Sequence, residues 1–503
     1  MSLTLEMVYD LLTKAGLLKE FITPAGWHLN KQKLPQLTFS KLSYDSRQVD
    51  SQTLFFCKGL NFKEEYLTAA LSQGLEVYLA DQPYETEAAC ALITTDIRKA
   101  MALISMAFYS YPQEKLKIVA FTGTKGKTTA AYFTHGILQE TTGGKTALLS
   151  TMNTTLDGKN FFKSHLTTPE SLDLYQMMAE AVANGMTHLI MEVSSQAYKT
   201  QRVYGLQYDV GIFLNISPDH ISPIEHPTFD DYFYCKRQLL ANSKVMVLDA
   251  DMDYYDLVAE TCDHLGVPTY TYGRDAGDYR VSTNTKNQNE FYLENRVDPL
   301  QITGNYQIKL AGDFNQDNAT AAIIAAVLLG ATTEEAYLGL SKVLVPGRMI
   351  RLQTQTGATV YIDYAHNYIS LKLLLEFAKK QSTGRVLVVL GSPGNKALSR
   401  RQDFGNVLSE LADIAILTAD DPAYEDPQAI ADEIAKAITN PEVLLHFEMD
   451  RSKAIRQALA MGQKDDVVII AGKGLDAMQK VNGEDVFYEG DYAIAKGWIE
   501  EHK

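Results

Sequence analysis

The chain has 503 residues, of which 46% are hydrophobic and 21% charged, and its formal net charge is −16. This length exceeds one ordinary core and predicts two to four domains, and the composition is that of a soluble globular protein. The acidic balance argues against a nucleic-acid-binding protein, which needs a basic face. Four scattered cysteines without CxxC pairs are typical of reduced thiols in a cytoplasmic protein, and we expect neither a signal peptide nor a membrane-spanning segment.

Residues 1–98 are predicted to form a small mixed α/β domain. Asp45-Ser46-Arg47 lies in a polar stretch before its first strand, and is interpreted either as a capped turn or as a ligand-binding turn. Apolar residues with helical or strand spacing mark its elements. The expected helices are 3–18 and 66–73, and the expected strands are 53–57 and 77–80.

Residues 99–346 form a second predicted unit, in which strands alternate with helices. This order predicts a mostly parallel, doubly wound α/β sheet. Residues 275–301 are polar and strand-like, which predicts a peripheral sheet. The expected strands are 116–122, 188–193, 210–214 and 244–248, and the expected helices include 171–184, 229–241 and 315–329.

The stretch 116–138 of this unit combines a buried strand, a Gly-rich turn and a helix. The turn is Gly123-Thr124-Lys125-Gly126, and the helix opens with Lys127-Thr128-Thr129. The N–H groups of such a turn and the positive end of the helix point at an anion. We therefore expect Lys127 to reach the terminal phosphates of a nucleotide and Thr128 to ligate Mg²⁺. The strict P-loop pattern has glycine where Phe121 stands, so a plain strand-to-helix turn with a chance lysine is the alternative.

Residues 347–503 form a third predicted unit, which begins again with strands and is expected to be Rossmann-like. The expected strands are 360–364, 385–390, 414–418 and 467–471. Each of them ends at a polar or Gly-rich stretch, and ligands of open α/β sheets bind at the carboxyl ends of the strands. The unit therefore presents several candidate contact loops on one edge, although ordinary turn chemistry explains any single loop. These stretches begin at Asp363, Gly391, Asp420 and Gly472.

Other polar residues at the ends of predicted elements are candidates for metal or phosphate contacts. Glu192 ends a strand, where a carboxylate either holds Mg²⁺ or water or precedes a helix cap. His220 follows the next strand and is either a metal ligand or structural. Arg348 lies between the second and third units, where it either reaches phosphate or forms an interface salt bridge. Thr167-Thr168 precedes a proline at a helix start, and its hydroxyl groups either cap the helix or hold an anion.

Assembled in chain order, these segments resemble the Mur ligases, ATP-dependent enzymes that add amino acids to the bacterial cell-wall precursor. The resemblance covers nearly the whole chain and implies three domains: an N-terminal UDP-binding domain, a central P-loop ATPase domain and a C-terminal Rossmann-like domain. Gln196 stands where the family usually has histidine. The motifs that carry the resemblance are GTKGKTT, EVSSQA, NISPDH, GDFNQDNATAA, PGRM and DYAHN.

The first unit narrows the resemblance to one group of the family. YDSRQV followed by LFFCKG is similar to the UDP-sugar domain of the members that add the third residue, and TTPE and QRV fit the same group. A folylpolyglutamate synthetase would share the ATPase core but lack this domain. The resemblance implies that ATP phosphorylates the D-glutamate carboxylate of UDP-N-acetylmuramoyl-L-alanyl-D-glutamate and that an amine then attacks the acyl phosphate.

The resemblance also implies roles for individual residues. The loop residues Gly123, Thr124, Lys125, Gly126, Lys127, Thr128 and Thr129 would bind the ATP phosphates. The catalytic and metal-binding set would be Lys127, Thr128, Glu192, His220 and Lys236, the last as a carbamylated lysine. Asn315 and Asn318 would lie near adenine, and Arg348 and Asp363 would contact ATP. The UDP-linked substrate would be bound by Ser46, Thr167, Thr168, Ser194 and Arg202, whereas Thr200 stands where some relatives have glutamine.

The identity of the added amino acid depends on Asp420-Asp421-Pro422-Ala423. Members that add meso-diaminopimelate have D-N-P-R there, and that arginine pairs with the extra carboxylate. Ala423 removes the arginine, Asp421 adds an anion, and Asp476 after Gly472 adds a third carboxylate. Such a pocket suits a cationic side chain, with Arg401 on the α-carboxylate, so we predict L-lysine. L-Ornithine stays open, and ordinary surface aspartates are the alternative.

Three further expectations concern partners and motion. We expect a cytoplasmic monomer that binds ATP and Mg²⁺ and neither nucleic acid nor membrane, and a third domain that closes over the cleft. A P-loop ATPase that switches partners is the rival from another class, and it would hydrolyse ATP without the UDP-dipeptide. A diaminopimelate-adding ligase is the rival within the family, and Ala423 disfavours it. The base that deprotonates the incoming amine is not identified by the sequence.

Overall fold

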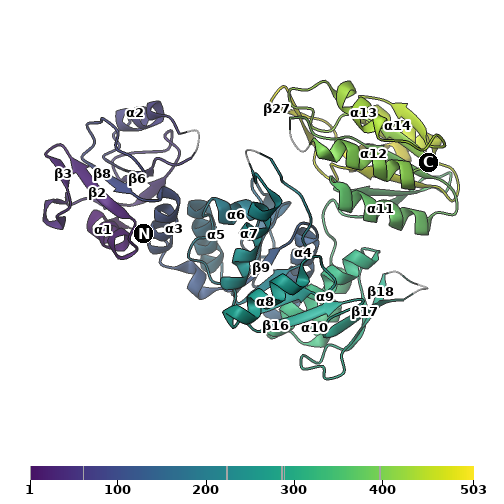
Figure 1. Cartoon of the computed structure of the whole chain (residues 1–503), viewed down its shortest axis with the longest axis horizontal. Helices are drawn as coiled ribbons and strands as arrows, with labels where there is room; N and C mark the ends of the chain where they lie inside the picture. Colours follow the sequence, from purple (N-terminus) through teal and green to yellow (C-terminus); the bar gives the residue numbers. More distant parts are fainter. Residues whose placement is uncertain are drawn as a thin grey trace.

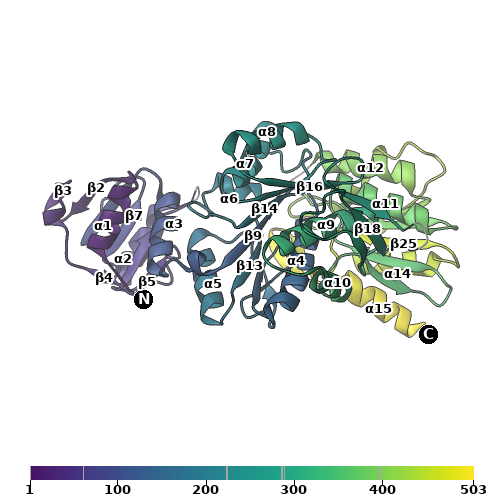
Figure 2. The ribbon, with the colours of Figure 1, turned by 90° about the horizontal axis from the view of Figure 1, so that it is seen from below.

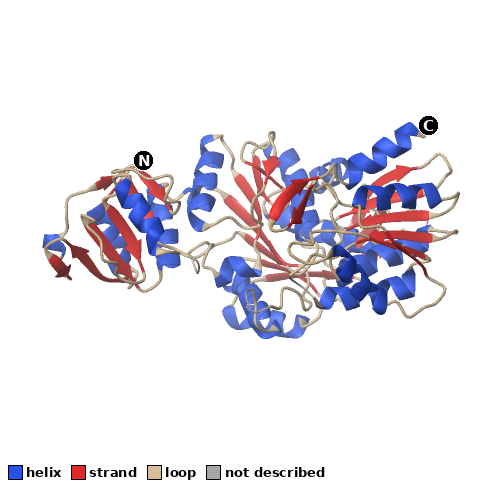
Figure 3. Cartoon of the chain, turned by 90° about the horizontal axis from the view of Figure 1, so that it is seen from above, coloured by secondary structure: helices blue, strands red, loops and turns tan. Residues whose placement is uncertain are grey.

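The computed structural model describes residues 2–59, 62–222, 225–284, 287, 289–395 and 398–502. Three α/β units follow one another along the chain, with the central unit between the other two (Figure 1). The same order is seen from below and from above, where helices flank the sheets (Figures 2 and 3). Within the described part of the chain, no helix is both long and apolar enough to cross a membrane.

The N-terminal unit is a six-stranded sheet in the order β3-β2-β8-β7-β6-β5. Strands β5 to β8 are parallel, and β2 and β3 are antiparallel to their neighbours. The predicted mixed α/β class is confirmed. The elements are β1 Leu3–Thr4, α1 Leu5–Lys14, β2 Leu18–Thr23, β3 Gly26–His28, β4 Thr38–Phe39, β5 Lys41–Ser43, β6 Thr53–Phe56, α2 Glu64–Ser72, β7 Val77–Ala80, β8 Cys90–Thr94 and α3 Ile97–Phe108.

Two local features of this unit differ from the prediction. The helix predicted over 3–18 ends at Lys14, because Gly16 at φ +67° turns the chain and Leu18 begins β2. The predicted domain boundary after residue 98 falls inside α3. Apolar side chains of α3, including Ile104, pack into the N-terminal core, so we propose that the first domain extends through this helix.

The central unit is an eleven-stranded sheet in the order β12-β11-β10-β13-β9-β14-β15-β16-β17-β18-β19. The seven strands that follow one another in this sheet as β10-β13-β9-β14-β15-β16-β17 are parallel, which confirms the doubly wound prediction. The elements are β9 Lys117–Thr122, α4 Lys127–Thr142, β10 Thr146–Leu149, β11 Asn153–Thr155, β12 Phe162–Lys163, α5 Ser171–Ala183, β13 His188–Glu192, α6 Ser195–Lys199, β14 Val210–Phe213, α7 Phe229–Ala241, β15 Met246–Asp249, α8 Tyr255–Leu265, β16 Thr269–Gly273, β17 Tyr279–Thr283, β18 Glu290–Glu294, β19 Gly304–Gln307, α9 Asp313–Leu328 and α10 Thr333–Lys342.

The edge of this sheet contains the segment that was expected to form a peripheral sheet. β17 pairs with β16, and β18 and β19 add antiparallel strands, so 275–301 extends the central sheet instead of forming a separate one. Residues 285, 286 and 288 of that prediction lie outside the described residues.

Strand β9 lies in the middle of the central sheet and places the site. Its sequence KIVAFT is buried at every position except the first, as expected of a parallel strand covered on both faces. β13 and β14 flank it on opposite sides. The chain therefore switches direction across the sheet at β9, and ligands of such sheets bind outside the carboxyl ends at this point.

The C-terminal unit is a six-stranded sheet in the order β20-β21-β25-β22-β23-β24. All but the edge strand β20 are parallel, as expected of a Rossmann-like unit. The elements are β20 Ile350–Gln353, β21 Thr359–Asp363, α11 Tyr368–Gln381, β22 Val386–Leu390, α12 Ser399–Leu411, β23 Ile414–Leu417, α13 Pro427–Lys436, β24 Leu444–Phe447, α14 Arg451–Met461, β25 Val467–Ala471, β26 Met478–Val481, β27 Glu484–Phe487 and α15 Asp491–Glu501. The domain boundary before residue 347 stays a proposal.

Helix α10 packs tightly on α4, the helix that follows the phosphate loop. A Cβ on Gly339 would lie 2.5 Å from Cα of Ile137, and a Cβ on Gly136 would lie 2.2 Å from Cγ2 of Val343. The two glycines therefore set how closely the helices approach.

Gly339→Ala should lower the free energy of unfolding by about 1–3 kcal/mol, because the added methyl group meets backbone atoms that cannot move aside. Chemical denaturation measures the change. The control is Gly497→Ala in helix α15, where nothing lies within 4 Å of the new Cβ. That change should stabilise by about 0.5–1 kcal/mol through helix propensity, and equal effects of the two substitutions would contradict the packing argument.

Candidate active site

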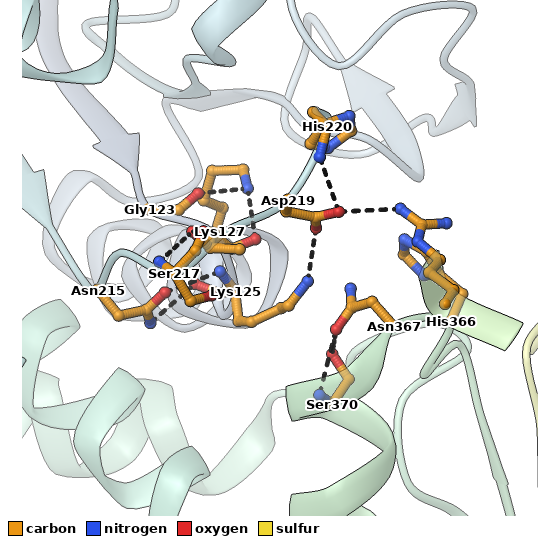
Figure 4. A network of polar contacts seen from close by, with 12 residues as sticks. Gly123, Lys125, Lys127, Asn215, Ser217, Asp219, His220, His366, Asn367 and Ser370 are labelled. Carbon is orange, nitrogen blue, oxygen red and sulfur yellow. Dashed lines mark hydrogen bonds and ion pairs between the residues drawn. The ribbon is translucent and has the colours of Figure 1, made fainter. Parts of the chain in front are cut away.

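The loop Gly123–Gly126 follows β9 and is fixed by the end of β14. The amide of Asn215 accepts a hydrogen bond from the N–H of Lys125 at 2.9 Å, and the carbonyl of Asn215 accepts one from the N–H of Thr124 at 3.1 Å. The hydroxyl of Thr124 pairs with the backbone of Ser217. Figure 4 shows these contacts around the loop. The strand-turn-helix unit predicted from sequence is thus present, with α4 starting at Lys127.

Close packing of the loop requires glycine at two positions, and a Cβ on Gly123 would lie 3.1 Å from Cβ of Leu214. Gly126 has φ +81°, and a Cβ there would lie 2.2 Å from Oδ1 of Asn318. Asn318 therefore borders the loop from α9. Asn315, its expected partner near adenine, is 1% exposed and donates a hydrogen bond from Nδ2 to the carbonyl of Ala311.

Two buried lysines converge on one carbonyl of the loop. Nζ of Lys127 donates to the carbonyl oxygen of Gly123 at 2.8 Å, and Nζ of Lys236 donates to the same oxygen at 2.7 Å. Burial lowers the pKa of Lys127, and it lowers the pKa of Lys236 far below its ordinary value. Amines in such an environment gain stability from a bound anion, which is what a nucleotide phosphate supplies.

Glu192 is a buried carboxylate, 1% exposed, at the end of β13. It accepts hydrogen bonds from the hydroxyl of Thr128 at 2.8 Å and from the N–H and hydroxyl of Thr151 at 2.8 and 2.9 Å. The structure thus brings together Thr128 and Glu192, two of the residues expected to hold Mg²⁺. Hydroxyl and carboxylate oxygens are the ligand type that this ion prefers.

His220 is oriented differently from the other expected metal ligands. Its backbone has φ +57°, its side chain is 45% exposed, and Nδ1 lies 3.2 Å from a carboxylate oxygen of Glu225. In this arrangement the imidazole is engaged by Glu225 rather than by Glu192 or Thr128.

Asp219, beside His220, connects the loop to the C-terminal unit. One carboxylate oxygen lies 2.8 Å from Nζ of Lys125, and the other lies 3.1 Å from a guanidinium nitrogen of Arg400 in α12. Burial alone would raise the pKa of Asp219, but Lys125, His220 and Arg400 together hold it well below its usual range. His366 lies close to this group in Figure 4, and burial keeps its pKa well below the usual value.

Arg348 and Asp363 meet at the joint between the central and C-terminal units. Their side chains are 3.8 Å apart, and the carboxylate of Asp363 also accepts a hydrogen bond from the N–H of Met349 at 2.8 Å. Burial raises the pKa of Asp363, and Arg348 opposes that rise. The guanidinium also lies over the ring of Tyr364.

The residues expected to bind the UDP-linked substrate gather where the N-terminal and central units meet. The hydroxyl of Thr168 donates to the carbonyl of Glu192 at 3.0 Å and lies 3.4 Å from the hydroxyl of Ser194. Arg202 pairs with Glu170 at 3.0 Å, and Lys58 of the N-terminal unit pairs with Glu170 at 2.7 Å.

The two remaining members of that set have simpler surroundings. Thr167 contacts Thr151 through its hydroxyl at 3.1 Å. Ser46 lies in the N-terminal unit, where its carbonyl accepts a hydrogen bond from Gln73. The loop that holds Thr167 is thus tied to the same threonine that binds Glu192.

The predicted acidic cluster Asp420, Asp421 and Asp476 is present and contains a cation of the chain itself. Nζ of Lys473 lies 2.8 Å from Asp421, 3.4 Å from Asp476 and 3.9 Å from Asp420. Burial by itself would lower the pKa of Lys473, but the carboxylates raise it above its ordinary value. The cluster is anionic in sum, yet less so than its three carboxylates alone imply. Lys163 of the central unit approaches Asp476 at 3.5 Å.

The backbone around this cluster is closely fitted. Gly472 has φ +115°, and a Cβ there would lie 2.7 Å from Oδ2 of Asp420. Ala423, next to Pro422, has φ +54° and donates its N–H to the carbonyl of Lys480 in the β26–β27 hairpin at 2.8 Å. This hairpin therefore holds the loop that carries the aspartates.

Arg401 does not face this cluster. Its side chain is 3% exposed, and its guanidinium pairs with Glu425 and Glu433, each at 2.8 Å. The two carboxylates satisfy the positive charge of Arg401 in this structure, and its contact with the α-carboxylate of the added amino acid stays a prediction. The sequence could not reveal this pairing because its partners come from a separate loop and helix.

Three residues at the site were not predicted. Thr151 follows β10, a strand that the sequence analysis did not identify. Arg400 lies next to Arg401, and the sequence pattern does not distinguish the two arginines. Lys473 lies in a Gly-rich stretch, and nothing in the sequence indicates a role for its side chain. The polar pair Ser150-Thr151 after the apolar run of β10 would have been the signal for Thr151.

Comparisons with known proteins agree with this geometry. Residues 121–326 match the Mur ligase middle domain, and residues 347–474 match the Mur ligase, glutamate ligase domain. A UDP-N-acetylmuramoyl-L-alanyl-D-glutamate–L-lysine ligase of Enterococcus faecalis is 58% identical over 99% of both chains. One of Streptococcus pyogenes is 50% identical over 99% of this chain and 100% of its own.

The chain belongs to the Mur ligase family.

Solved structures of Mur ligases share the fold over nearly the whole length. A UDP-N-acetylmuramoyl-L-alanyl-D-glutamate–2,6-diaminopimelate ligase superposes with a TM-score of 0.67 at 23% identity, covering 100% of this chain and 99% of the other. A MurF ligase of Thermotoga maritima, solved in complex with ADP, superposes with a TM-score of 0.60 at 16% identity, covering 92% and 97%. The three-domain α/β architecture is therefore that of the Mur ligases.

Gly126→Ala should weaken nucleotide binding at least about tenfold, because the methyl group would displace Asn318 and the positive φ strains an alanine. Titration calorimetry with ATP and Mg²⁺ measures the affinity. Gly143→Ala is the matched control, since Gly143 has φ +63° at the end of α4 but open space around it. Unchanged ATP affinity in Gly126→Ala would contradict the assignment of the loop to phosphate.

Proposed function

We propose that this chain is an ATP-dependent ligase that adds L-lysine to UDP-N-acetylmuramoyl-L-alanyl-D-glutamate in peptidoglycan precursor synthesis. The observation that carries the proposal is the 58% identity over 99% of the chain to a ligase of that name. The site supports it independently, because it combines a cationic phosphate loop in one unit with an anionic cluster in another. A polyanionic nucleotide and a cationic amino acid are the ligands that such a pair of sites accepts.

The phosphate loop accounts for the nucleotide. Lys125 and Lys127 with the loop N–H groups would hold the phosphates of ATP, and Asn318 would border the nucleotide from α9. Arg348, paired loosely with Asp363 at 3.8 Å, would contribute a guanidinium from the joint of the two units. The Thermotoga maritima ligase, solved in complex with ADP, has the same fold.

The reaction has two bond-forming steps. The D-glutamate carboxylate attacks the γ-phosphorus of ATP, the bond from that phosphorus to the ADP oxygen breaks, and an acyl phosphate forms. The amine of lysine then attacks the acyl carbon, the carbon–oxygen bond to phosphate breaks, and phosphate leaves as the amine loses a proton. In both steps, Lys127 would stabilise the negative charge that develops on the phosphate oxygens, in a site that excludes most water.

The residues present fit a divalent cation beside the phosphates. Thr128 and Glu192 form a hard-oxygen pair 2.8 Å apart at the start of α4, and Lys236 reaches the same loop. Mg²⁺ bound there would neutralise phosphate charge. We propose that Lys236 acts as its carbamate, since its lowered pKa favours the neutral amine that reacts with CO₂. His220 would have to leave Glu225 to join this set.

The acidic cluster supports lysine as the added amino acid. Asp420, Asp421 and Asp476 gather around the ammonium of Lys473, and Lys163 approaches Asp476 from the central unit, so ammonium groups are the kind of charge that this loop already holds among the described residues. A side-chain carboxylate, as in diaminopimelate, would be repelled there, and Ala423 offers it no partner.

The UDP-linked substrate is assigned to the junction of the N-terminal and central units. Thr168, Ser194 and Arg202 lie there, and Lys58 ties the two units together through Glu170. We also propose that the chain acts as a cytoplasmic monomer, because one chain supplies every residue of the site and its four cysteines are free and buried.

Phosphate release with ATP, Mg²⁺ and the UDP-dipeptide should be strong with L-lysine, weaker with L-ornithine and absent with meso-diaminopimelate. The shorter ornithine side chain places its ammonium farther from the aspartates, and diaminopimelate brings an unpaired carboxylate to them. Mass spectrometry of the UDP-linked product identifies the amino acid. Turnover with diaminopimelate would contradict the pocket assignment, and release without dipeptide and amino acid would contradict the ligase.

Lys236→Ala and Lys236→Arg should both abolish ligation, because neither side chain forms a carbamate. Carbon-13 NMR of enzyme equilibrated with labelled bicarbonate should show a carbamate resonance in the wild type that is missing in Lys236→Arg. Lys244→Arg makes the same change at a lysine that is 65% exposed, and it should keep both activity and resonance. Activity of Lys236→Arg at the wild-type level would refute the carbamate.

A further inference from the structure

Asp219 is a carboxylate shared by two cations from different units. Oδ2 binds Lys125 of the phosphate loop at 2.8 Å, and Oδ1 binds Arg400 of α12 at 3.1 Å. The side chains are 8%, 16% and 12% exposed for Asp219, Lys125 and Arg400. Each cation thus occupies its own oxygen, and neither displaces the other.

This arrangement poses a problem for nucleotide binding. If Lys125 is to contact a phosphate, its ammonium must turn from Asp219, which is the carboxylate that holds it now. A buried carboxylate that loses its cation is strongly destabilised, because water does not replace the lost partner. With Lys125 as its sole cation, Asp219 would therefore compete with ATP for the lysine.

Arg400 removes this competition. We propose that Arg400 is a positioning residue of the nucleotide site, which neutralises Asp219 from the C-terminal unit and so allows Lys125 to move to a phosphate oxygen. The inference rests on the placement of the nucleotide phosphates at the Gly123–Gly126 loop. The ion pair that Arg400 forms within the described part of the chain is with Asp219, so we expect its effect on the nucleotide to pass through that carboxylate.

The same contact couples two events. Because Arg400 belongs to α12, it reaches Asp219 when the C-terminal unit lies against the central one, as in this structure. Binding of ATP and docking of the C-terminal unit then favour each other, and thermodynamic linkage requires the effect to be equal in both directions. The affinity of the central unit for ATP therefore depends on whether the C-terminal unit is docked against it.

The test is a double-mutant cycle on ATP affinity, measured by titration calorimetry with the full chain and Mg²⁺. Arg400→Gln should weaken ATP binding about tenfold, since Asp219 then retains Lys125. Arg400→Lys keeps a cation and should change affinity by less than about threefold. In the Asp219→Asn background, Arg400→Gln should have no effect, because the competing carboxylate is gone.

The control and the kinetic readout separate this role from a loss of structure. Lys379→Gln breaks an ion pair with Asp413 inside the C-terminal unit, and it should leave ATP affinity unchanged. In ligation assays Arg400→Gln should raise KM for ATP with kcat kept within about threefold, whereas a damaged fold would lower kcat. If Arg400→Gln does not fold, two other comparisons of ATP affinity test the proposal. One compares Asp219→Asn with Asp219→Asn/Arg400→Gln, and the other compares Arg400→Lys with the wild type.

Two results would overturn the proposal. One is wild-type ATP affinity in Arg400→Gln, and the other is an equal loss of affinity on adding Arg400→Gln to Asp219→Asn. The ATP affinities are measured without lysine or the UDP-dipeptide, so this test is independent of the test of the ligase assignment. If ligation with lysine were absent while the cycle behaved as described, the coupling would stand and the proposed function would fall.

Discussion

The structure depends on how the charge of buried lysines is balanced around one loop. Lys127 and Lys236 both donate to the carbonyl of Gly123, and burial lowers the pKa of each. Lys125, one turn of the loop away, has a pKa lowered to about 8 by burial, although Asp219 opposes that shift. A loop of this kind is stable in water only with part of its charge removed, and it is completed by a polyanion.

The same electrostatic logic, with the sign reversed, describes the C-terminal unit. Three aspartates surround Lys473 at the carboxyl ends of β23 and β25. In the proposed function, the cations of the central unit would bind the nucleotide, and the aspartates of the C-terminal unit would bind the amine of the amino acid. Asp219 and Arg400 join the two regions across the domain boundary. Asp219 is an anion beside the cationic loop, and Arg400 is a cation from the unit that contains the acidic cluster.

Sequence reasoning predicted those parts of the fold that follow from local pattern. The parallel strands β9, β13, β21 and β25 are continuous apolar runs, and the loop after β9 has its own glycines, so both were found. Strand β10 was missed, and with it Thr151, the residue that donates two hydrogen bonds to Glu192.

Side-chain partners from distant segments were beyond sequence reasoning. Arg401 and Arg400 are neighbours in one helix, yet one pairs inside its own unit and the other reaches Asp219, 181 residues away along the chain. Lys473 had no visible partner until the fold placed it among the aspartates. The helix α3, in turn, crosses the boundary expected after residue 98 because its two faces serve different cores.

The most direct test of the charge balance is the number of protons taken up when ATP binds. Calorimetric titrations with ATP and Mg²⁺ at pH 8, in buffers with different ionisation enthalpies, give this number. Lys125, with a pKa of about 8, is roughly half deprotonated there, and a bound phosphate raises that pKa, so we predict that Lys125 takes up close to, and at most, about half a proton. Binding with no uptake of protons, or uptake unchanged in Lys125→Met, would contradict the account.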